Sequence, residues 1–88
     1  MPGMLVDLHV IYTRSDRILV SRRRYESWRQ IQVEIADYMA SLGPWPPQEM
    51  IEYLDGEHPG LDPGATEQVN ALLASAEAII ELKFARSR

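Results

Sequence analysis

The beginning of the chain alternates apolar and polar residues in a way that predicts a β-hairpin. From Met4 to Tyr12 every even position is apolar, whereas the odd positions mix polar with apolar residues. Successive side chains of a strand point to opposite faces, so this strand has one apolar face and one mixed face. Residues 14–16 interrupt the pattern with turn-forming polar side chains, and residues 17–21 resume it with β-branched and aliphatic ones.

The register of this hairpin follows from keeping the apolar side chains together. Pairing Val10 with Val20 and Tyr12 with Ile18 places them on one face. An isolated two-stranded hairpin is only marginally stable in water, so this face requires a covering layer and preferably a third strand. The remainder of the chain has to supply both.

Residues 26–42 carry the clearest helical pattern of the sequence. Apolar residues recur there at spacings of three and four, with polar residues on the opposite side, as in an amphipathic helix. Gly43 and Pro44 predict its end, because glycine accepts the left-handed cap conformation and proline cannot continue a helix. The predicted apolar stripe consists of Trp28, Ile31, Ile35, Tyr38, Met39 and Leu42.

The middle of the chain predicts a stiff, proline-rich connector at residues 44–47 and then two shorter helices. The first helix covers residues 48–55. The second begins near Asp62 or Thr66, either of which can act as its N-cap, and ends at about Ala76.

The C-terminal residues 78–86 are compatible with two structures. Their alternation is typical of a strand, but they are also good helix formers without glycine or proline and could extend the preceding helix. We favour the strand, because the hairpin needs a third partner. The predicted fold is therefore a single α+β domain: a small antiparallel sheet, made of the hairpin and the C-terminal strand, packed on helices on one face in the order ββααβ.

Length and composition narrow the class of protein. A chain of 88 residues forms one domain with one compact core and little room for an internal catalytic cavity. The absence of cysteine excludes disulfides, thiolate zinc sites and a cysteine nucleophile. No apolar run is long enough to cross a membrane and no signal-peptide pattern is present, so we expect a cytoplasmic protein without membrane contact.

Charge is distributed unevenly along the chain, although the net charge is only −4. Residues 14–29 contain six arginines and two acidic residues, whereas residues 43–82 contain eight acidic residues and no lysine or arginine. Such asymmetry affects partners and association rates rather than the fold. The two regions either face each other, within the molecule or across a dimer interface, or they contact partners.

Residues 22–29 form the sharpest candidate binding segment. Arginines interleave there with aromatic side chains, so the segment could bind phosphates while a ring stacks on a base. The arginine fork also suits carboxylates and could dock an acidic protein surface. The simpler alternative is that the arginines pair with the chain's own acidic residues and that Trp28 belongs to the core. The candidate binding residues are Arg22, Arg23, Arg24, Tyr25 and Arg29.

Acidic residues between positions 49 and 62 form a second candidate surface. They could imitate the phosphates of a nucleic acid or bind a basic protein, and a solvated acidic helix face is the simpler alternative. We expect no metal ion among them, because the ligand spacing of a calcium loop is missing. The candidate residues are Glu49, Glu52, Asp55 and Glu57.

Trp45 lies between two prolines and is a third candidate contact residue. It is either an exposed aromatic anchor for a partner or a side chain that folds back over the core. His9 and His58 are the only histidines, and neither belongs to a recognisable nucleophilic or acid–base constellation. No phosphate-binding glycine loop is present. We therefore expect no catalytic residue and no cofactor.

These features predict a small non-enzymatic binding protein. A regulator, an inhibitor or an accessory subunit that contacts another protein or protein complex through its charged surfaces would fit them. The alternative is a nucleic-acid-binding protein that uses residues 22–29. An open sheet edge would also allow two copies to pair into a homodimer.

Overall fold

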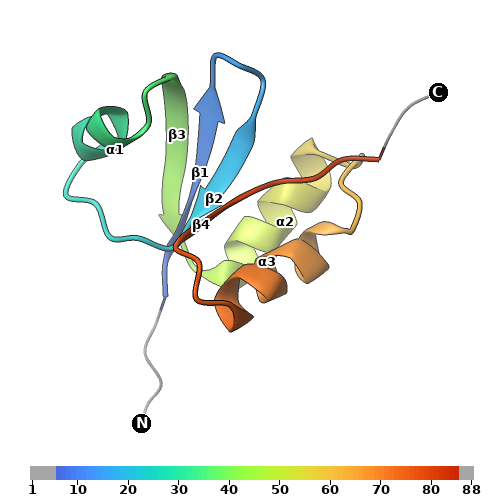
Figure 1. The fold of residues 1–88 in the computed structure, drawn as a ribbon. Helices are drawn as coiled ribbons and strands as arrows, with labels where there is room; N and C mark the ends of the chain where they lie inside the picture. Colours follow the sequence, from blue (N-terminus) through green and yellow to red (C-terminus); the bar gives the residue numbers. More distant parts are fainter. Residues whose placement is uncertain (1–5, 86–88) are drawn as a thin grey trace, which may run out of the picture.

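The computed structural model describes residues 6–85 of the chain (Figure 1). Within these residues it contains a four-stranded antiparallel sheet and three helices, which confirms the predicted α+β class. In chain order the elements are β1 (Leu8–Thr13), β2 (Ile18–Ser21), α1 (Trp28–Glu34), β3 (Tyr38–Trp45), α2 (Pro47–Glu57), α3 (Ala65–Ala74) and β4 (Ile79–Glu81).

The N-terminal hairpin has the predicted register. Val10 pairs with Val20 and Tyr12 pairs with Ile18 across β1 and β2. Asp16 in the turn has a φ of 65°, a left-handed conformation that aspartate adopts more readily than most residues. The apolar alternation and the turn residues are therefore sufficient to specify this element.

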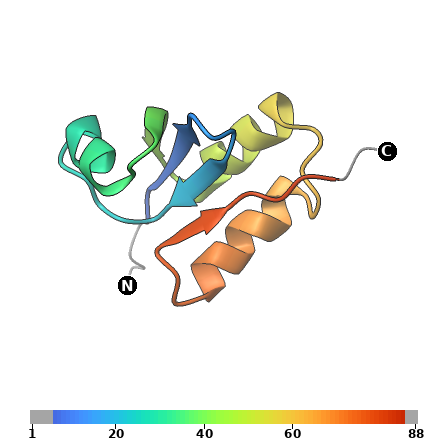
Figure 2. The ribbon, with the colours of Figure 1, turned by 45° about the horizontal axis from the view of Figure 1, so that its top comes forward.

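The sheet has the strand order β3-β1-β2-β4, so that β1 and β2 are its inner strands. Helices α2 and α3 cover one face, as Figures 1 and 2 show, and bury the even-numbered side chains of β1. The residues of this main core are Leu8, Val10, Val20, Met50, Leu54, Ala65, Val69, Leu72 and Leu82.

The opposite face of the sheet is covered only in part. Helix α1 packs there against odd-numbered side chains, and its Ile31 forms a second, smaller core with Ile11 and Leu19. Helices thus lie on both faces, whereas the sequence analysis placed them on one. The part of this face that α1 leaves uncovered contains the candidate site.

The prediction of a long helix over residues 26–42 is correct for its first half and wrong after Glu34. Helix α1 ends at Glu34, and the following segment forms the edge strand β3, antiparallel to β1. The segment gains a ladder of interstrand hydrogen bonds by leaving the helix, because β1 would otherwise have an unpaired edge. Ile31 is the only fully buried residue of the predicted stripe. Its exposed members are Trp28, Met39 and Leu42.

Asp37 marks the point at which the chain turns from α1 into β3. Its carboxylate accepts hydrogen bonds from the hydroxyl of Ser15 and from the guanidinium of Arg17, the latter at 3.3 Å. Its backbone carbonyl accepts a hydrogen bond from the N–H of Arg14 at 2.8 Å. The hydrogen bond from Ser15 lowers the pKa of Asp37, with a further contribution from Arg17. An acidic residue in the middle of the predicted helix thus binds the hairpin turn.

Within the strand predicted over residues 78–86, Ile79–Glu81 form β4 and the helical extension is not found as far as residue 85; residue 86 lies outside the described residues. Strand β4 pairs antiparallel with β2, with Ile80 opposite Val20. Helices α2 and α3 agree with the two short predicted helices to within a few residues. The observed order ββαβααβ keeps the terminal strands of the predicted ββααβ, its three helices lie at the three segments for which the pattern predicts helices, and β3 is the additional element. None of the helices within residues 6–85 has the length and apolar character that crossing a bilayer requires.

Strand β3 is irregular, and its irregularity at Gly43 shapes the candidate site. Two residues of β3, Gly43 and Pro44, face the single residue His9 of β1. Gly43 has a φ of +115°, and a Cβ on it would lie 2.6 Å from the carbonyl oxygen of Leu8. Glycine alone accepts this close approach without strain. The predicted proline-rich connector therefore belongs to β3 as far as Trp45.

Both edges of the sheet are short or irregular. Strand β3 has two register shifts and contains Pro44, which has no N–H group, and β4 has only 3 residues. Features of this kind discourage pairing with another chain. The shape of the edges therefore does not favour the homodimer that an open edge would allow.

The substitution Gly43→Ala should destabilise the protein by about 2 kcal/mol or more, because the added Cβ meets backbone atoms at a φ that disfavours L-residues. Urea denaturation monitored by circular dichroism measures this loss. Gly56→Ala is the matched control: apart from its chain neighbours and the backbone of its own helix, nothing lies within 4 Å of its added Cβ. Because Gly56 lies in α2, its substitution should leave the stability unchanged or raise it by up to about 1 kcal/mol. Equal changes in stability in the two variants would contradict the conclusion that the irregularity of β3 requires glycine at position 43.

Candidate functional site

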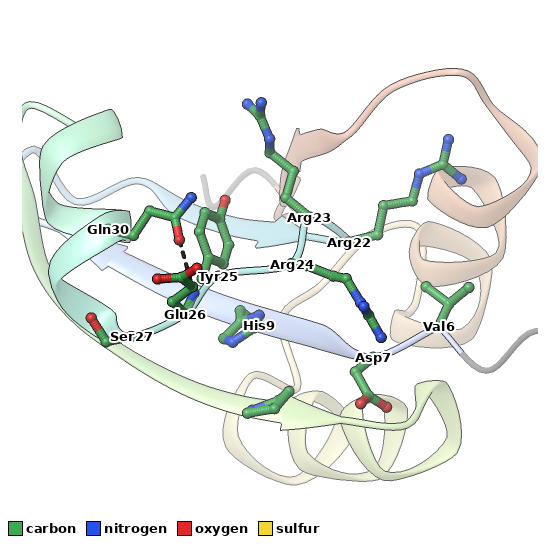
Figure 3. A pocket seen from close by; sticks show the side chains of 11 residues that line it. Val6, Asp7, His9, Arg22, Arg23, Arg24, Tyr25, Glu26, Ser27 and Gln30 are labelled. Atoms are coloured by element: carbon green, nitrogen blue, oxygen red, sulfur yellow. Dashed lines mark hydrogen bonds between the residues drawn. The ribbon is translucent and has the colours of Figure 1, made fainter.

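A groove of about 990 Å³ lies on the sheet face that α1 leaves open (Figure 3). It is located where β1 begins and β2 ends. Residues 22–27, which connect β2 to α1 and are called here the arginine linker, form one wall. The residues lining this arginine groove are Val6, Asp7, His9, Arg22, Arg23, Arg24, Tyr25, Glu26, Ser27, Gln30 and Pro44.

Arg22 attaches the arginine linker to the helix layer. Its guanidinium donates three hydrogen bonds to carbonyl oxygens at the C-terminal end of α3. The acceptors are Leu72 and Leu73, both at 3.2 Å, and Ser75 at 2.7 Å. The last carbonyls of a helix lack partners within it, and the negative end of the helix dipole favours a cation. Arg22, a predicted partner-binding residue, is therefore engaged within the protein.

Tyr25 supports the arginine linker from the sheet side. Its hydroxyl lies 2.9 Å from Oγ of Ser21, and its ring packs edge-on against His9 with 5.1 Å between the centroids. Oγ of Ser21 also accepts a hydrogen bond from the N–H of Arg23 at 3.1 Å. Burial raises the pKa of Tyr25, so its hydroxyl stays protonated at neutral pH. This half-buried ring holds the wall of the groove and is not free to stack on a base.

His9 lies on the floor of the groove and has unused hydrogen-bonding capacity. It is 8% exposed, and its Nδ1 is the one buried side-chain polar atom in the described chain that lacks a hydrogen-bond partner. Burial lowers the pKa of His9, an effect that the carboxylate of Asp7 partly opposes. The imidazole is therefore neutral at pH 7 and can both donate and accept. Buried polar atoms are normally paired, so this nitrogen is an unsatisfied polar atom that lies just below the accessible surface of the floor.

Arg23 and Arg24 are the exposed arginines of the linker. Arg23 pairs with Glu34 of α1 at 3.4 Å, an exposed contact that contributes little to stability. Arg24 has no salt-bridge partner within residues 6–85, and Figure 3 shows its side chain directed toward Asp7. Glu26 places a second carboxylate on the far side of His9. The groove is thus mixed in charge: Arg24, which makes no salt bridge in this part of the chain, shares it with the carboxylates of Asp7 and Glu26.

A smaller hollow of about 270 Å³ continues from the groove toward α1 and β3 and is called here the α1 hollow. It shares His9 and part of the arginine linker with the groove, and Trp28 and Ile31 add apolar walls. Trp28 is 52% exposed and stacks on Tyr38, and the guanidinium of Arg29 lies 5.4 Å from its ring centroid. The assignment of Trp28 to the core is therefore wrong: it lines a surface hollow.

The acidic residues of α2 do not meet the arginine groove, because α2 packs on the opposite face of the sheet. The predicted residues Glu49, Glu52, Asp55 and Glu57 are all exposed. The salt bridges in the described part of the chain are Arg17–Asp37, Arg17–Glu81 and Arg23–Glu34. Of these, the exposed Arg17–Glu81 contact at 4.0 Å joins the basic region 14–29 to the acidic region 43–82, and none joins residues 22–29 to residues 49–62. Residues 6–85 also contain no group of three or more histidine or acidic side chains arranged to hold a metal ion.

Trp45 and His58 take part in the packing of the fold. Trp45 is half-buried against the main core, with its ring centroid 5.0 Å from that of Tyr53. The hydroxyl of Tyr12 lies 2.6 Å from the hydroxyl of Tyr53 and 3.0 Å from Nε2 of His58. Burial raises the pKa of Tyr12 strongly, so it remains a neutral hydroxyl. The network joins β1 to the end of α2 and places Trp45 against the core.

Sequence reasoning identified the arginine linker but missed the floor of the groove. The pattern marks His9 only as a polar residue on the mixed face and Gly43 only as the end of a helix. Their proximity depends on the pairing of β3 with β1, which the helical spacing conceals. The available signal is the aromatic and glycine–proline content of the segment from Tyr38 to Trp45, which is typical of an irregular edge strand.

Comparisons with protein-family models, with curated proteins and with solved structures find no match to this chain. The groove and the chemistry of its lining are therefore the basis for assigning a function.

The substitution Arg22→Ala should lower the free energy of unfolding by about 1–2 kcal/mol, because it removes three charge-assisted hydrogen bonds from the end of α3. Arg22→Lys should restore only part of this loss, because an ammonium group cannot reproduce the planar fork. Urea denaturation of both variants measures the effect. Arg24→Ala is the control and should change stability by less than about 0.5 kcal/mol. A loss of stability in Arg24→Ala as large as that in Arg22→Ala would contradict the stabilising role of the hydrogen bonds between Arg22 and α3.

The pKa of His9 should lie below 6.5, and Asp7→Asn should lower it further by removing the carboxylate that opposes the shift. An NMR titration of the imidazole C2 proton, assigned with His9→Gln, measures both values. The unfolded chain binds this proton more readily than the folded one, so the contribution of His9 to stability is complete above about pH 6.5 and declines as the pH falls toward the folded pKa. A pKa at or above 6.5 would contradict the burial of this ring.

Proposed function

We propose that this protein is a non-enzymatic binding protein that docks an acidic segment of a partner protein in the arginine groove. It would act as a regulator, an inhibitor or an accessory subunit of a larger assembly. The arginines of the linker provide charge complementarity, and the sheet provides a rigid floor. No covalent bond is made or broken in this mechanism.

The position of Arg24 is the observation that supports this proposal. Its side chain is exposed, lines the groove and has no salt-bridge partner among residues 6–85. A guanidinium beside a rigid floor offers two parallel donors to a carboxylate, which is the geometry of strong bidentate pairing. Because the acidic residues of α2 lie on the other face, the protein's own carboxylates there do not compete for this position.

Nucleic-acid binding is the alternative, and the surface pair of Trp28 and Arg29 favours it, since an exposed ring beside a guanidinium can stack on a base. Charge opposes it: the net charge is −4, and the exposed acidic residues of α2 repel a phosphate backbone. Arg22 and Tyr25 are engaged within the protein. The remaining cations are few for the multiple phosphate contacts that such binding requires.

The groove offers little for an enzymatic role. A catalytic histidine normally has one ring nitrogen oriented by a carboxylate or carbonyl while the other acts on the substrate. Nδ1 of His9 has no such partner. Binding of a partner segment is therefore a simpler function for this groove than catalysis.

The proposal predicts that blocked hexaglutamate shifts the backbone amide signals of the arginine linker and of His9 in a ¹⁵N NMR titration. Raising the salt concentration from about 50 to about 200 mM should weaken this binding, because exposed charges are screened. Arg24→Glu should raise the Kd by about tenfold or more, because the reversed charge repels the peptide.

Arg14→Glu is the matched control, since Arg14 is an exposed arginine in the turn at the other end of the hairpin and its reversal changes the net charge equally. It should leave the Kd within about twofold of the original. Equal losses in both variants would show a general charge effect and contradict the groove. A twelve-nucleotide single-stranded DNA that shifts the same signals while hexaglutamate does not would replace the proposal with the nucleic-acid alternative.

A further inference from the structure

The arginine groove and the α1 hollow are one continuous surface feature. They share His9, the segment from Tyr25 to Ser27, and Pro44 in their linings. A ligand that occupies the groove therefore has direct access to the hollow across the ring of His9. The site is longer than a single carboxylate requires.

The two ends of this feature differ in chemistry. The groove end contains Arg24 and Arg23, which attract an anion. The hollow end is lined by the exposed ring of Trp28, by the buried side chain of Ile31 and by the backbone at Gly43. Trp28 and Ile31 provide the apolar part of a lining that also includes Ser27 and Ser41, and the volume of about 270 Å³ is small, which suits one large side chain and not an extended surface.

His9, which lines both the arginine groove and the α1 hollow, favours a ligand with polar groups at this position. Nδ1 of His9 is buried without a hydrogen-bond partner, and the imidazole is neutral because burial lowers its pKa. A peptide that crosses this floor presents backbone N–H and C=O groups, with which a neutral imidazole can form a hydrogen bond after a small adjustment. A free phosphate or a lone carboxylate would leave the apolar end unused.

We infer that the site recognises a short peptide segment in which an acidic side chain is followed or preceded by a large apolar side chain. The acidic side chain binds Arg24 in the arginine groove, the backbone crosses His9, and the apolar side chain enters the α1 hollow against Trp28. This inference rests on the proposed function and specifies the partner's chemistry: an acidic segment with an apolar anchor, and not an acidic surface in general.

Paired blocked peptides test this inference. Each contains two glutamates and one phenylalanine separated by zero to three glycines, in both orders, and its counterpart replaces phenylalanine with alanine. For at least one spacing, the phenylalanine peptide should bind about tenfold tighter than its counterpart, which is the gain expected from burying one aromatic side chain. Fluorescence polarisation gives the Kd values, and ¹⁵N NMR locates the binding site.

Two variants of α1 provide the internal control. Trp28→Ala should reduce the advantage of the phenylalanine peptide to less than about threefold, because it removes a wall of the hollow. Val33→Ala should preserve the advantage, since Val33 is 84% exposed on the same helix and does not line the hollow. NMR spectra of the free variants show whether both retain the fold.

The outcomes separate this inference from the proposed function. Equal affinity for the phenylalanine and alanine peptides at every spacing and order, with both still shifting the signals of the arginine linker, would overturn the apolar anchor and leave acidic docking intact. Absence of binding by every acidic peptide would overturn both. A phenylalanine advantage that survives Trp28→Ala would place the apolar side chain elsewhere and also overturn the inference.

Discussion

The pairing of β3 with β1 is the interaction on which the rest of the structure depends. Strand β1 is buried on both faces, with Leu8, Val10 and Ile11 inaccessible to solvent, so the N–H and C=O groups on both of its edges need partners. Strand β2 pairs with one edge through the hairpin, and β3 pairs with the other. This demand places residues 38–42, whose own spacing favours a helix, in strand β3.

The groove is a consequence of the short helix that results. Because α1 ends at Glu34, it covers only part of the second face of the sheet, and the linker from β2 has to pass over the remainder. Arg22 holds one end of that linker on α3, and Tyr25 holds its middle on Ser21 and His9. These contacts fix the connector as one wall of the groove.

The sheet also separates the two charged regions. The arginine linker lies on the α1 side, whereas the exposed carboxylates of α2 lie on the other side, so they do not neutralise each other. Charge that is distributed unevenly over two faces in this way can orient the approach of a charged partner. The net charge of −4 conceals this arrangement, because it averages over two faces with different roles.

The α+β class, the hairpin with its Val10–Val20 register and the two short helices could be predicted from the sequence, because in these segments the local periodicity and the pattern of burial agree. The C-terminal strand is compatible with the pattern but is favoured over a helix because the hairpin needs a further partner. The sequence also located the arginine linker, but not which of its arginines are free: the hydrogen bonds of Arg22 join it to residues about fifty positions away. Three features follow from long-range contacts: residues 38–45 form a strand, Trp28 lies at the surface, and His9 faces Gly43. All three features depend on the second edge of β1, whose N–H and C=O groups need hydrogen-bond partners. This long-range requirement outweighs the local helical spacing and cannot be recognised from that spacing.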